Sequence, residues 1–315
     1  MSDEGTVPGA DGTPLAVTVD GSPEAPVTVV LAHGWTLDSR TWGPVAQRLT
    51  PAAHVVRYDH RGHGRSAAVD PATMTIDQLA DDLAAVIAAT APQGPLVLVG
   101  HSMGGMTLMA LADRHPDVLA RARGVALVAT ASGGLANPTL GLPPAAARVI
   151  ARGQARMAAR PDWSTRRSLG NPTVLAPALR WLLLGRDASP EARRLTVGAV
   201  ARCRPLTVSG FRPTLDTHER DTALAAFAQL PTVILAGTRD RLTPVRLSRR
   251  IAAALPAAQL TVFPDAGHML PVERVTGVAA RISALVADAT RGAAAAARPD
   301  PARPAGTAGL RPPHG

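Results

Sequence analysis

The sequence predicts an α/β fold in which a mostly parallel β-sheet is flanked by helices. Short apolar runs rich in β-branched residues alternate with longer helical patterns along the 315 residues, as expected for strands joined by crossover helices. Several runs are apolar at consecutive positions, which is typical of strands buried on both faces. The alternation stops after Ala131 and resumes near Pro231. A helical insertion is therefore expected between two parts of the sheet.

Individual elements follow from these patterns. Strands are expected at Leu15–Val19, Val27–Ala32, His54–Tyr58, Leu96–Val99, Val125–Val128, Thr232–Ala236 and Gln259–Phe263. Helices are expected at Trp42–Leu49, Ile76–Ala89, Met103–Arg114, Val245–Leu255 and Val272–Asp288. His115 ends the third helix, because the residue before a proline disfavours the α region.

The chain is expected to divide into a core, a cap and a tail. Residues 1–131 and 231–290 form the predicted core, and residues 132–230 form a helical cap. Within the cap, helical patterns cover Ala145–Ala159 and Ala178–Leu184. Residues 291–315 are rich in Ala, Arg, Pro and Gly. A segment of this composition cannot bury a core, so we expect it to be disordered.

Composition excludes several classes of protein. Cys203 is the only cysteine, which rules out an intramolecular disulfide framework and a multi-cysteine zinc site. The start of the chain lacks the features of a signal peptide, and no apolar run approaches the roughly 20 residues that span a bilayer. No membrane insertion is expected, and a cytoplasmic setting is the default.

The positive charge of the chain is concentrated in the predicted cap. The net charge is +9, and all 33 basic residues are arginines. Between Arg148 and Arg220 there are 14 arginines and five acidic residues, a difference equal to the charge of the whole chain. We interpret this surplus as a solvated outer face, with a site for an acidic substrate as the alternative. Because only 3% of residues are aromatic, a base-stacking nucleic-acid platform is not expected.

A serine nucleophile is predicted at residue 102. The segment Gly100-His101-Ser102-Met103-Gly104 fits the pattern G-x-S-x-G and lies between a predicted buried strand and a predicted helix, the context that this motif requires. Such a turn is so tight that the residues two before and two after the serine must be small. It also places the Met103 N–H at a helix N-terminus, where a developing oxyanion is stabilised.

A histidine and a carboxylate are needed to activate this serine. His268 follows the last predicted strand, and Asp240 follows the strand Thr232–Ala236. Both therefore emerge at the same edge of a parallel sheet as Ser102. Asp265 lies closer to the histidine in the sequence, but a residue three positions before it is expected at the strand end rather than beneath the imidazole.

Two further loops are expected at this edge. Trp35, in His33-Gly34-Trp35, follows a predicted strand, so its N–H can supply the second oxyanion donor beside Met103. The segment Asp59–Ser66 contains two histidines three positions apart. A metal site is disfavoured there because Arg61 and Arg65 would repel a cation, and a glycine-punctuated turn is preferred.

Taken together, these motifs resemble the α/β-hydrolase superfamily, in its capped branch with a Ser-Asp-His triad. The resemblance covers about Leu15 to Asp288 and depends on His33-Gly34-Trp35, the Asp59–Ser66 turn, the Gly100–Gly104 elbow and the pair Asp240 and His268, in that order. It implies an eight-stranded sheet with the cap after the sixth strand, an acyl-serine mechanism and no cofactor. Ser102 stands where dehalogenases and epoxide hydrolases of this fold have aspartate. Among the other members of the branch, the chain resembles carboxylesterases, lactonases, thioesterases and cofactor-free perhydrolases.

The predicted function is hydrolysis of a small to medium apolar ester, lactone or thioester, without a metal, a cofactor or a nucleic acid. Trp35, Trp163 and Trp181 are candidates to line an apolar pocket with Leu182–Leu184, although such a leucine run also fits a plain core. Three alternatives stay open: perhydrolysis or C–C bond hydrolysis on the same triad, ligand binding without turnover, and membrane or nucleic-acid binding through the cap. The sequence does not determine the oligomeric state.

Overall fold

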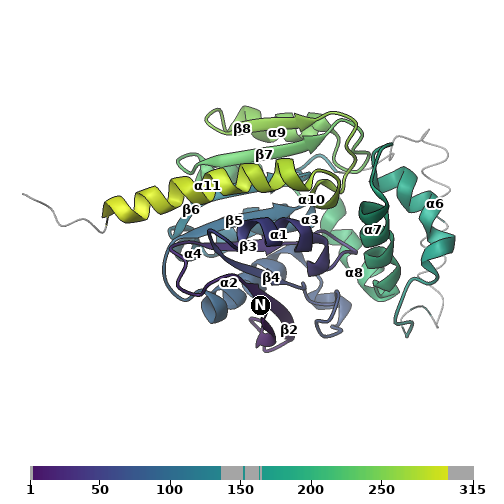
Figure 1. Ribbon diagram of the computed structural model, residues 1–315. Helices are drawn as coiled ribbons and strands as arrows, with labels where there is room; N and C mark the ends of the chain where they lie inside the picture. Colours follow the sequence, from purple (N-terminus) through teal and green to yellow (C-terminus); the bar gives the residue numbers. More distant parts are fainter. Residues whose placement is uncertain (1–2, 136–151, 153–162, 164, 297–315) are drawn as a thin grey trace, which may run out of the picture.

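The computed structural model describes residues 3–135, 152, 163 and 165–296. In this part of the chain an eight-stranded sheet has the order β1-β2-β4-β3-β5-β6-β7-β8 (Figure 1). Its strands are β1 (Asp3–Pro8), β2 (Pro14–Asp20), β3 (Thr28–Ala32), β4 (His54–Tyr58), β5 (Leu96–His101), β6 (Ala122–Val128), β7 (Thr232–Gly237) and β8 (Gln259–Phe263). β2 pairs antiparallel with β1 and β4, and all other neighbours are parallel. The predicted α/β class is confirmed.

Helices cover both faces of this sheet and extend beyond one end of it (Figure 1). They are α1 (Gly43–Leu49), α2 (Ile76–Thr90), α3 (Met103–Arg114), α4 (Pro116–Leu119), α6 (Pro172–Leu183), α7 (Pro190–Arg202), α8 (Pro205–Asp216), α9 (Val245–Ala254), α10 (Leu270–Glu273) and α11 (Val275–Ala296). Short 3-10 helices lie at η1 (Ser39–Trp42), η2 (Pro71–Thr73) and η3 (Thr222–Phe227). No helix in the described ranges has both the length and the apolar content needed to cross a membrane.

Alternation along the central strands divides the core into two layers. In β3, Val29 and Leu31 pack with α1 and α11, whereas Val30 and Ala32 pack with α2, α3 and α9. Successive side chains of a strand point to opposite faces, so a strand covered on both sides must be apolar throughout. Each fully buried Val or Leu contributes about 1.5–3 kcal/mol relative to exposure. The sheet is therefore a rigid support for the loops at its ends.

The structure differs from the sequence-based prediction at both ends of the chain. β1 was not predicted, because its residues are mostly exposed and lack an apolar alternation; backbone pairing with β2 at the sheet edge places it. The predicted helix Val272–Asp288 is divided into α10 and α11 at Arg274. α11 also continues to Ala296, into residues expected to be disordered, because alanine has the highest helix propensity. The predicted helix Ala145–Ala159 lies almost entirely outside the described residues.

Three helices of the segment between β6 and β7 lie beyond the carboxyl edge of the sheet. α6, α7 and α8 stand apart from the sheet at one end of the molecule (Figure 1). Polar contacts fasten them to the core: Arg202 Nη2 donates to Asp38 Oδ2 at 2.9 Å, and Thr207 Oγ1 donates to the Gly62 carbonyl at 2.7 Å. Arg204 Nη1 donates to the same carbonyl at 3.0 Å. The loops at this edge therefore face the helices of the insertion.

Candidate active site

Ser102 occupies a sharp turn between β5 and α3. Its backbone has φ 52° and ψ −118°, a left-handed conformation that costs of order 1–3 kcal/mol in a non-glycine residue. A Cβ atom on Gly100 would lie 2.5 Å from the backbone of Gly104, and one on Gly104 would lie 2.3 Å from the Ala32 carbonyl oxygen. The two glycines of the motif are thus required sterically. The Thr130 hydroxyl donates to the Ser102 carbonyl at 2.7 Å and helps to hold the turn.

His268 and Asp240 form a buried acid–base pair. The Nδ1 atom of His268 lies 2.8 Å from Oδ2 of Asp240, and the two residues are 3% and 5% exposed. The carboxylate also accepts hydrogen bonds from the backbone N–H groups of Leu242 and Thr243 and from the Thr243 hydroxyl. Four donors thus fix its orientation. The imidazole consequently presents Nε2 as its free, proton-accepting atom.

The loop that carries His268 is fastened to both the core and α6. The backbone N–H of His268 donates to the Leu183 carbonyl at 2.8 Å, and Nε2–H of His101 donates to the His268 carbonyl at 2.9 Å. Glu273 accepts hydrogen bonds from the N–H groups of Gly267, Met269 and, at 2.7 Å, Gly185. Burial raises the pKa of this carboxyl. Glu273 therefore joins the histidine loop to the chain segment that follows α6.

Among the described residues no hydrogen bond joins Ser102 to His268, but His101, the residue before Ser102, contacts the His268 loop. His101, which precedes Ser102, has its ring centroid 4.9 Å from that of His268. Ser102 is partly exposed. The turn that carries Ser102 thus contacts the loop that carries His268.

The backbone amides of Trp35 and Met103 are available for an oxyanion. Among the described residues neither N–H donates to another group, and Met103 is the first residue of α3. A Cβ on Gly34 would lie 3.1 Å from the Cβ of Ser102, so the loop after β3 directly contacts the serine turn. The indole of Trp35 is half-buried and packs against the core.

Three neutral histidines hold the loop after β3. Nδ1–H of His33 donates to the Gly34 carbonyl, and its Nε2 accepts from the His60 N–H. His60 returns a hydrogen bond to the His33 carbonyl, and His63 Nε2 accepts from the Thr36 N–H. Burial lowers the pKa of His33 and His60, and it lowers that of His63 to about 3. The Asp59–Ser66 turn is therefore a scaffold for the loop that contains Trp35.

Of the tryptophans expected to line an apolar pocket, Trp181 has different surroundings, and those of Trp163 are only partly described. Trp181 is 44% exposed, and the Arg241 guanidinium lies 4.6 Å from the centroid of its ring. Trp163 is half-buried, and its neighbours 153–162 and 164 lie outside the described residues. Leu183 and Leu184 are buried against Met269 and Val272. The leucine run at the end of α6 thus packs against the core, as the alternative interpretation of a plain core run predicted.

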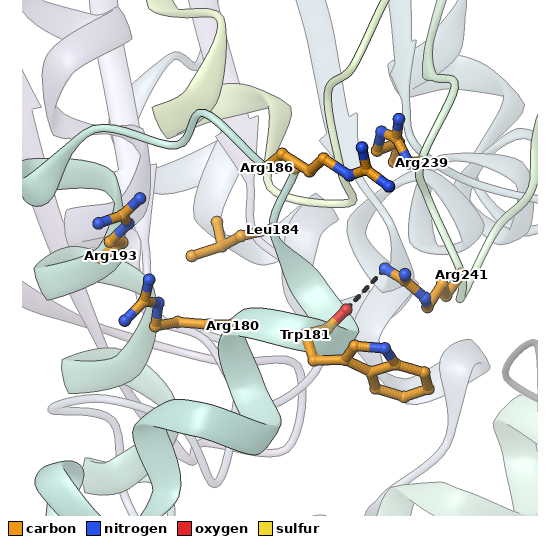
Figure 2. A pocket seen from close by; sticks show the side chains of 8 residues that line it. Arg180, Trp181, Leu184, Arg186, Arg193, Arg239 and Arg241 are labelled. Carbon is orange, nitrogen blue, oxygen red and sulfur yellow. Dashed lines mark hydrogen bonds between the residues drawn. The ribbon is translucent and has the colours of Figure 1, made fainter.

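Trp181 instead lines a pocket rich in arginine (Figure 2). The pocket has a volume of about 410 Å³ and is lined by Arg180, Trp181, Leu184, Gly185, Arg186, Arg193, Arg239 and Arg241. We call it the basic pocket. Arg239 donates to Asp265, the carboxylate rejected as the triad acid, and Arg241 donates to the Trp181 carbonyl. Asp265 is thus held at the surface, away from His268.

Sequence analysis missed three residues that support the site. Thr243 could have been anticipated, because a hydroxyl three residues after an aspartate is a common turn partner. His101 lies inside the serine motif, but nothing in the sequence links it to the His268 loop. Glu273 gives no local signal, because its three partners come together only in the folded chain.

Comparisons with known proteins show the family of the chain. A family model described as the alpha/beta hydrolase fold matches residues 27–275. A pimeloyl acyl-carrier-protein methyl ester esterase of Chromobacterium violaceum is 33% identical over 246 residues, which are 76% of this chain and 86% of that protein.

Solved structures show the same fold. An esterase of Thermogutta terrifontis, with malate bound, superposes with a TM-score of 0.74 at 24% identity and covers 91% of this chain and 99% of its own. The enol-lactonase of Burkholderia xenovorans LB400 gives a TM-score of 0.71 at 24% identity, over 90% and 100% of the two chains. Since the family model spans most of the chain and a relative exceeds 30% identity, the chain belongs to the α/β-hydrolase family and is a hydrolytic enzyme of this fold.

Proposed function

We propose that this hydrolase cleaves carboxylic esters, lactones or thioesters through an acyl-serine intermediate on Ser102. The observation that carries the proposal is the 2.8 Å contact between His268 Nδ1 and Asp240 Oδ2. This pair lies at the sheet edge where the strained turn presents Ser102. A hydroxyl in such a turn, close to an imidazole oriented by a carboxylate, is the arrangement that nucleophilic acyl transfer requires.

The proposed reaction begins when Ser102 Oγ attacks the substrate carbonyl and His268 Nε2 accepts the hydroxyl proton. Asp240 stabilises the resulting imidazolium, and the N–H groups of Trp35 and Met103 bind the tetrahedral oxyanion. The imidazolium then protonates the leaving alcohol or thiol as the bond to the acyl carbon breaks. Water, deprotonated by His268, attacks the acyl-serine. The bond to Ser102 Oγ then breaks, His268 returns the proton to this oxygen, and the acid is released.

The relatives support this choice of bond. The similar proteins include two named as esterases and one named as an enol-lactonase. These names refer to an ester or a lactone as the bond that is cleaved. In our proposal residues 132–230 act as a cap above the triad and select the acyl and leaving groups, because α6 to α8 face the loops that carry it.

Replacing the nucleophile tests the proposal. Ser102→Ala is expected to lower kcat for short p-nitrophenyl esters by roughly 10³- to 10⁶-fold with an unchanged fold, as loss of a triad nucleophile does. Ser22→Ala changes a serine in an exposed turn near the start of the chain. It is the matched control and should retain full activity. A fluorophosphonate probe should label the wild type and the control but not Ser102→Ala.

A substrate panel then ranks the acyl chemistry. Matched ester, lactone and thioester substrates of equal acyl length should separate the three bond types by kcat/KM. Turnover by Ser102→Ala at the rate of the wild type would refute the acyl-serine mechanism. Absence of multiple turnovers on every substrate, with stoichiometric retention of ligand, would instead support a binding protein.

A further inference from the structure

The basic pocket contains more positive charge than its surroundings neutralise. Five of its eight lining residues are arginines, and none is acidic. Within the described residues Arg180, Arg186 and Arg193 form no ion pair with a carboxylate, and Arg241 is held only by the Trp181 carbonyl and ring. Arg239 alone has an acidic partner, Asp265.

Some arginines elsewhere in the described part of the chain are held by carboxylates. Arg61, Arg220 and Arg250 each contact two carboxylates. Arg202 of α7 reaches across to Asp38. Arg194 and Arg204, which lie outside the pocket, also form no ion pair with a carboxylate among the described residues. The basic pocket is therefore distinguished by its five guanidiniums, which line one hollow and have a single carboxylate partner.

We propose that the basic pocket binds an oxyanion that carries at least two negative charges, with a phosphate group as the ligand chemistry. Guanidinium groups are planar forks that bind phosphate oxygens in pairs, and they keep their charge at all relevant pH values. Several guanidiniums around one hollow repel one another, and a multiply charged anion offsets this repulsion. A singly charged group such as chloride would offset less of it and could not accept paired hydrogen bonds.

The arrangement of the side chains fits such a ligand. In Figure 2, Arg186 extends toward Arg239 and Arg241 on one side, and Arg180 and Arg193 lie on the other side of Leu184. The charges thus come from α6, the segment between α6 and α7, α7 and the loop after β7. The volume of about 410 Å³ falls within the range of small-molecule sites. It leaves room for an organic group attached to the phosphate, against the apolar surfaces of Leu184 and Trp181.

The pocket adjoins the catalytic loop without including the catalytic residues. Arg239 and Arg241 flank Asp240, whose buried carboxylate contacts His268. The same loop therefore presents a carboxylate to the histidine and two guanidiniums to the pocket. None of Ser102, Asp240 and His268 is among the lining residues. The anion site is accordingly separate from the ester-cleaving residues and stands independently of the proposed function.

Binding of inorganic phosphate tests the proposal directly. Isothermal titration calorimetry of the full chain, with ionic strength held constant by NaCl, should give saturable binding of phosphate and none of chloride. The double variant Arg186→Gln/Arg193→Gln is expected to weaken phosphate binding at least tenfold. The control Arg246→Gln/Arg281→Gln removes the same charge from exposed positions outside the pocket, and it should change the affinity less than twofold.

Hydrolysis assays distinguish the two sources of the phosphate group. If the group belongs to the substrate, an ester with a terminal phosphate should exceed its uncharged analogue in kcat/KM, and Arg186→Gln/Arg193→Gln should remove that advantage. If free phosphate is the ligand, the two esters should react alike while calorimetric binding persists.

Two results would overturn the proposal. One is the absence of saturable heat up to about 10 mM phosphate, a concentration that would mostly fill even a millimolar site. The other is equal weakening by the pocket variant and the control, which would indicate only a general effect of net charge. Circular dichroism and the thermal midpoint of each variant check that the fold is intact. Calorimetry does not depend on turnover. A protein that binds phosphate but cleaves no ester would therefore contradict the proposed ester cleavage and leave the phosphate site supported.

Discussion

The core and the basic pocket use charged side chains in opposite ways. In the core, Arg61 is 0% exposed and makes two-point contacts with Asp82, also 0% exposed, while its remaining nitrogens reach Asp11. In the pocket, Arg186 is exposed and has no carboxylate partner among the described residues. Charge in the core fixes the loops in place, whereas charge in the pocket stays available to a ligand.

Asp240, the proposed catalytic acid, is likewise held in place by its partners. Asp240 accepts three hydrogen bonds from Leu242 and Thr243 in addition to its contact with His268. A carboxylate held in this way cannot turn away from the imidazole, so its charge serves one partner. The guanidiniums of Arg239 and Arg241, one residue to either side, are partly exposed. A buried carboxylate with four hydrogen-bond partners and two partly exposed guanidiniums that line the basic pocket thus lie within three consecutive residues.

The largest expected effect on catalysis comes from removing the charge of the Asp240 carboxylate. Asp240→Asn keeps the size of the side chain but orients and stabilises the imidazole wrongly, so kcat for esters should fall roughly 10⁴-fold. Asp265→Asn, in the neighbouring loop, removes an exposed charge that pairs with Arg239, and it should leave kcat within twofold. Steady-state kinetics of the two variants measures the contrast. Equal losses would show that Asp240 has no special relation to His268.

A smaller effect is expected when an arginine is removed from each region. Arg61→Met leaves Asp82 buried without its partner, which should cost about 3–5 kcal/mol in the free energy of unfolding. Arg186→Met removes an exposed, unpaired charge and should change that free energy by less than about 0.5 kcal/mol. Urea unfolding at neutral pH measures both. If the two variants lost similar stability, the distinction between the paired and the available arginines would be wrong.

The strands and turns that carry the candidate residues could be predicted from the sequence, because each candidate residue follows a recognisable strand. β4 and β8 have the predicted bounds, and α3 begins at the expected residue directly after Ser102. Parallel strands bring their carboxyl ends to one edge, so residues far apart in the chain could be assigned to one place without coordinates. The steric need for Gly100 and Gly104 followed from the motif in the same way.

The rest could not be predicted because it depends on contacts without local signals. The acidic residues that fasten the arginines come from distant segments, as when Arg202 meets Asp38. Composition alone therefore could not separate paired from unpaired arginines in the insertion. Trp181 was assigned to an apolar pocket on residue type, but its environment is set by Arg241, which belongs to the loop after β7. Pocket chemistry is thus a property of the assembled fold.

The smallest expected effect is the pH dependence of the free energy of unfolding. Buried histidines contribute to it, whereas the arginines of the basic pocket do not. Burial lowers the pKa of His218 to about 4 and that of His63 to about 3, whereas a histidine in the unfolded chain titrates near 6.5. Between about pH 6.5 and pH 4 the unfolded state therefore binds protons that the folded state does not. Stability is complete above this window and falls as the pH decreases through it, by about 1 kcal/mol per pH unit for each such histidine.

Urea unfolding between pH 6.5 and 4.5 measures this slope. His218→Gln should make the slope shallower by about 1 kcal/mol per pH unit, because one proton of the linkage is removed.

Carboxylates with lowered pKa values, such as Asp38 and Asp221, lose their contribution only as the pH falls below about 4, outside the measured range. Glu273, whose pKa is raised, acts with the opposite sign but is present in both proteins, so it cancels from the difference. Arg186→Met should leave the slope of the wild type unchanged, since arginine stays protonated throughout. A wild-type slope in His218→Gln would mean that this histidine is already charged in the fold, and that the acid sensitivity of the protein has another origin.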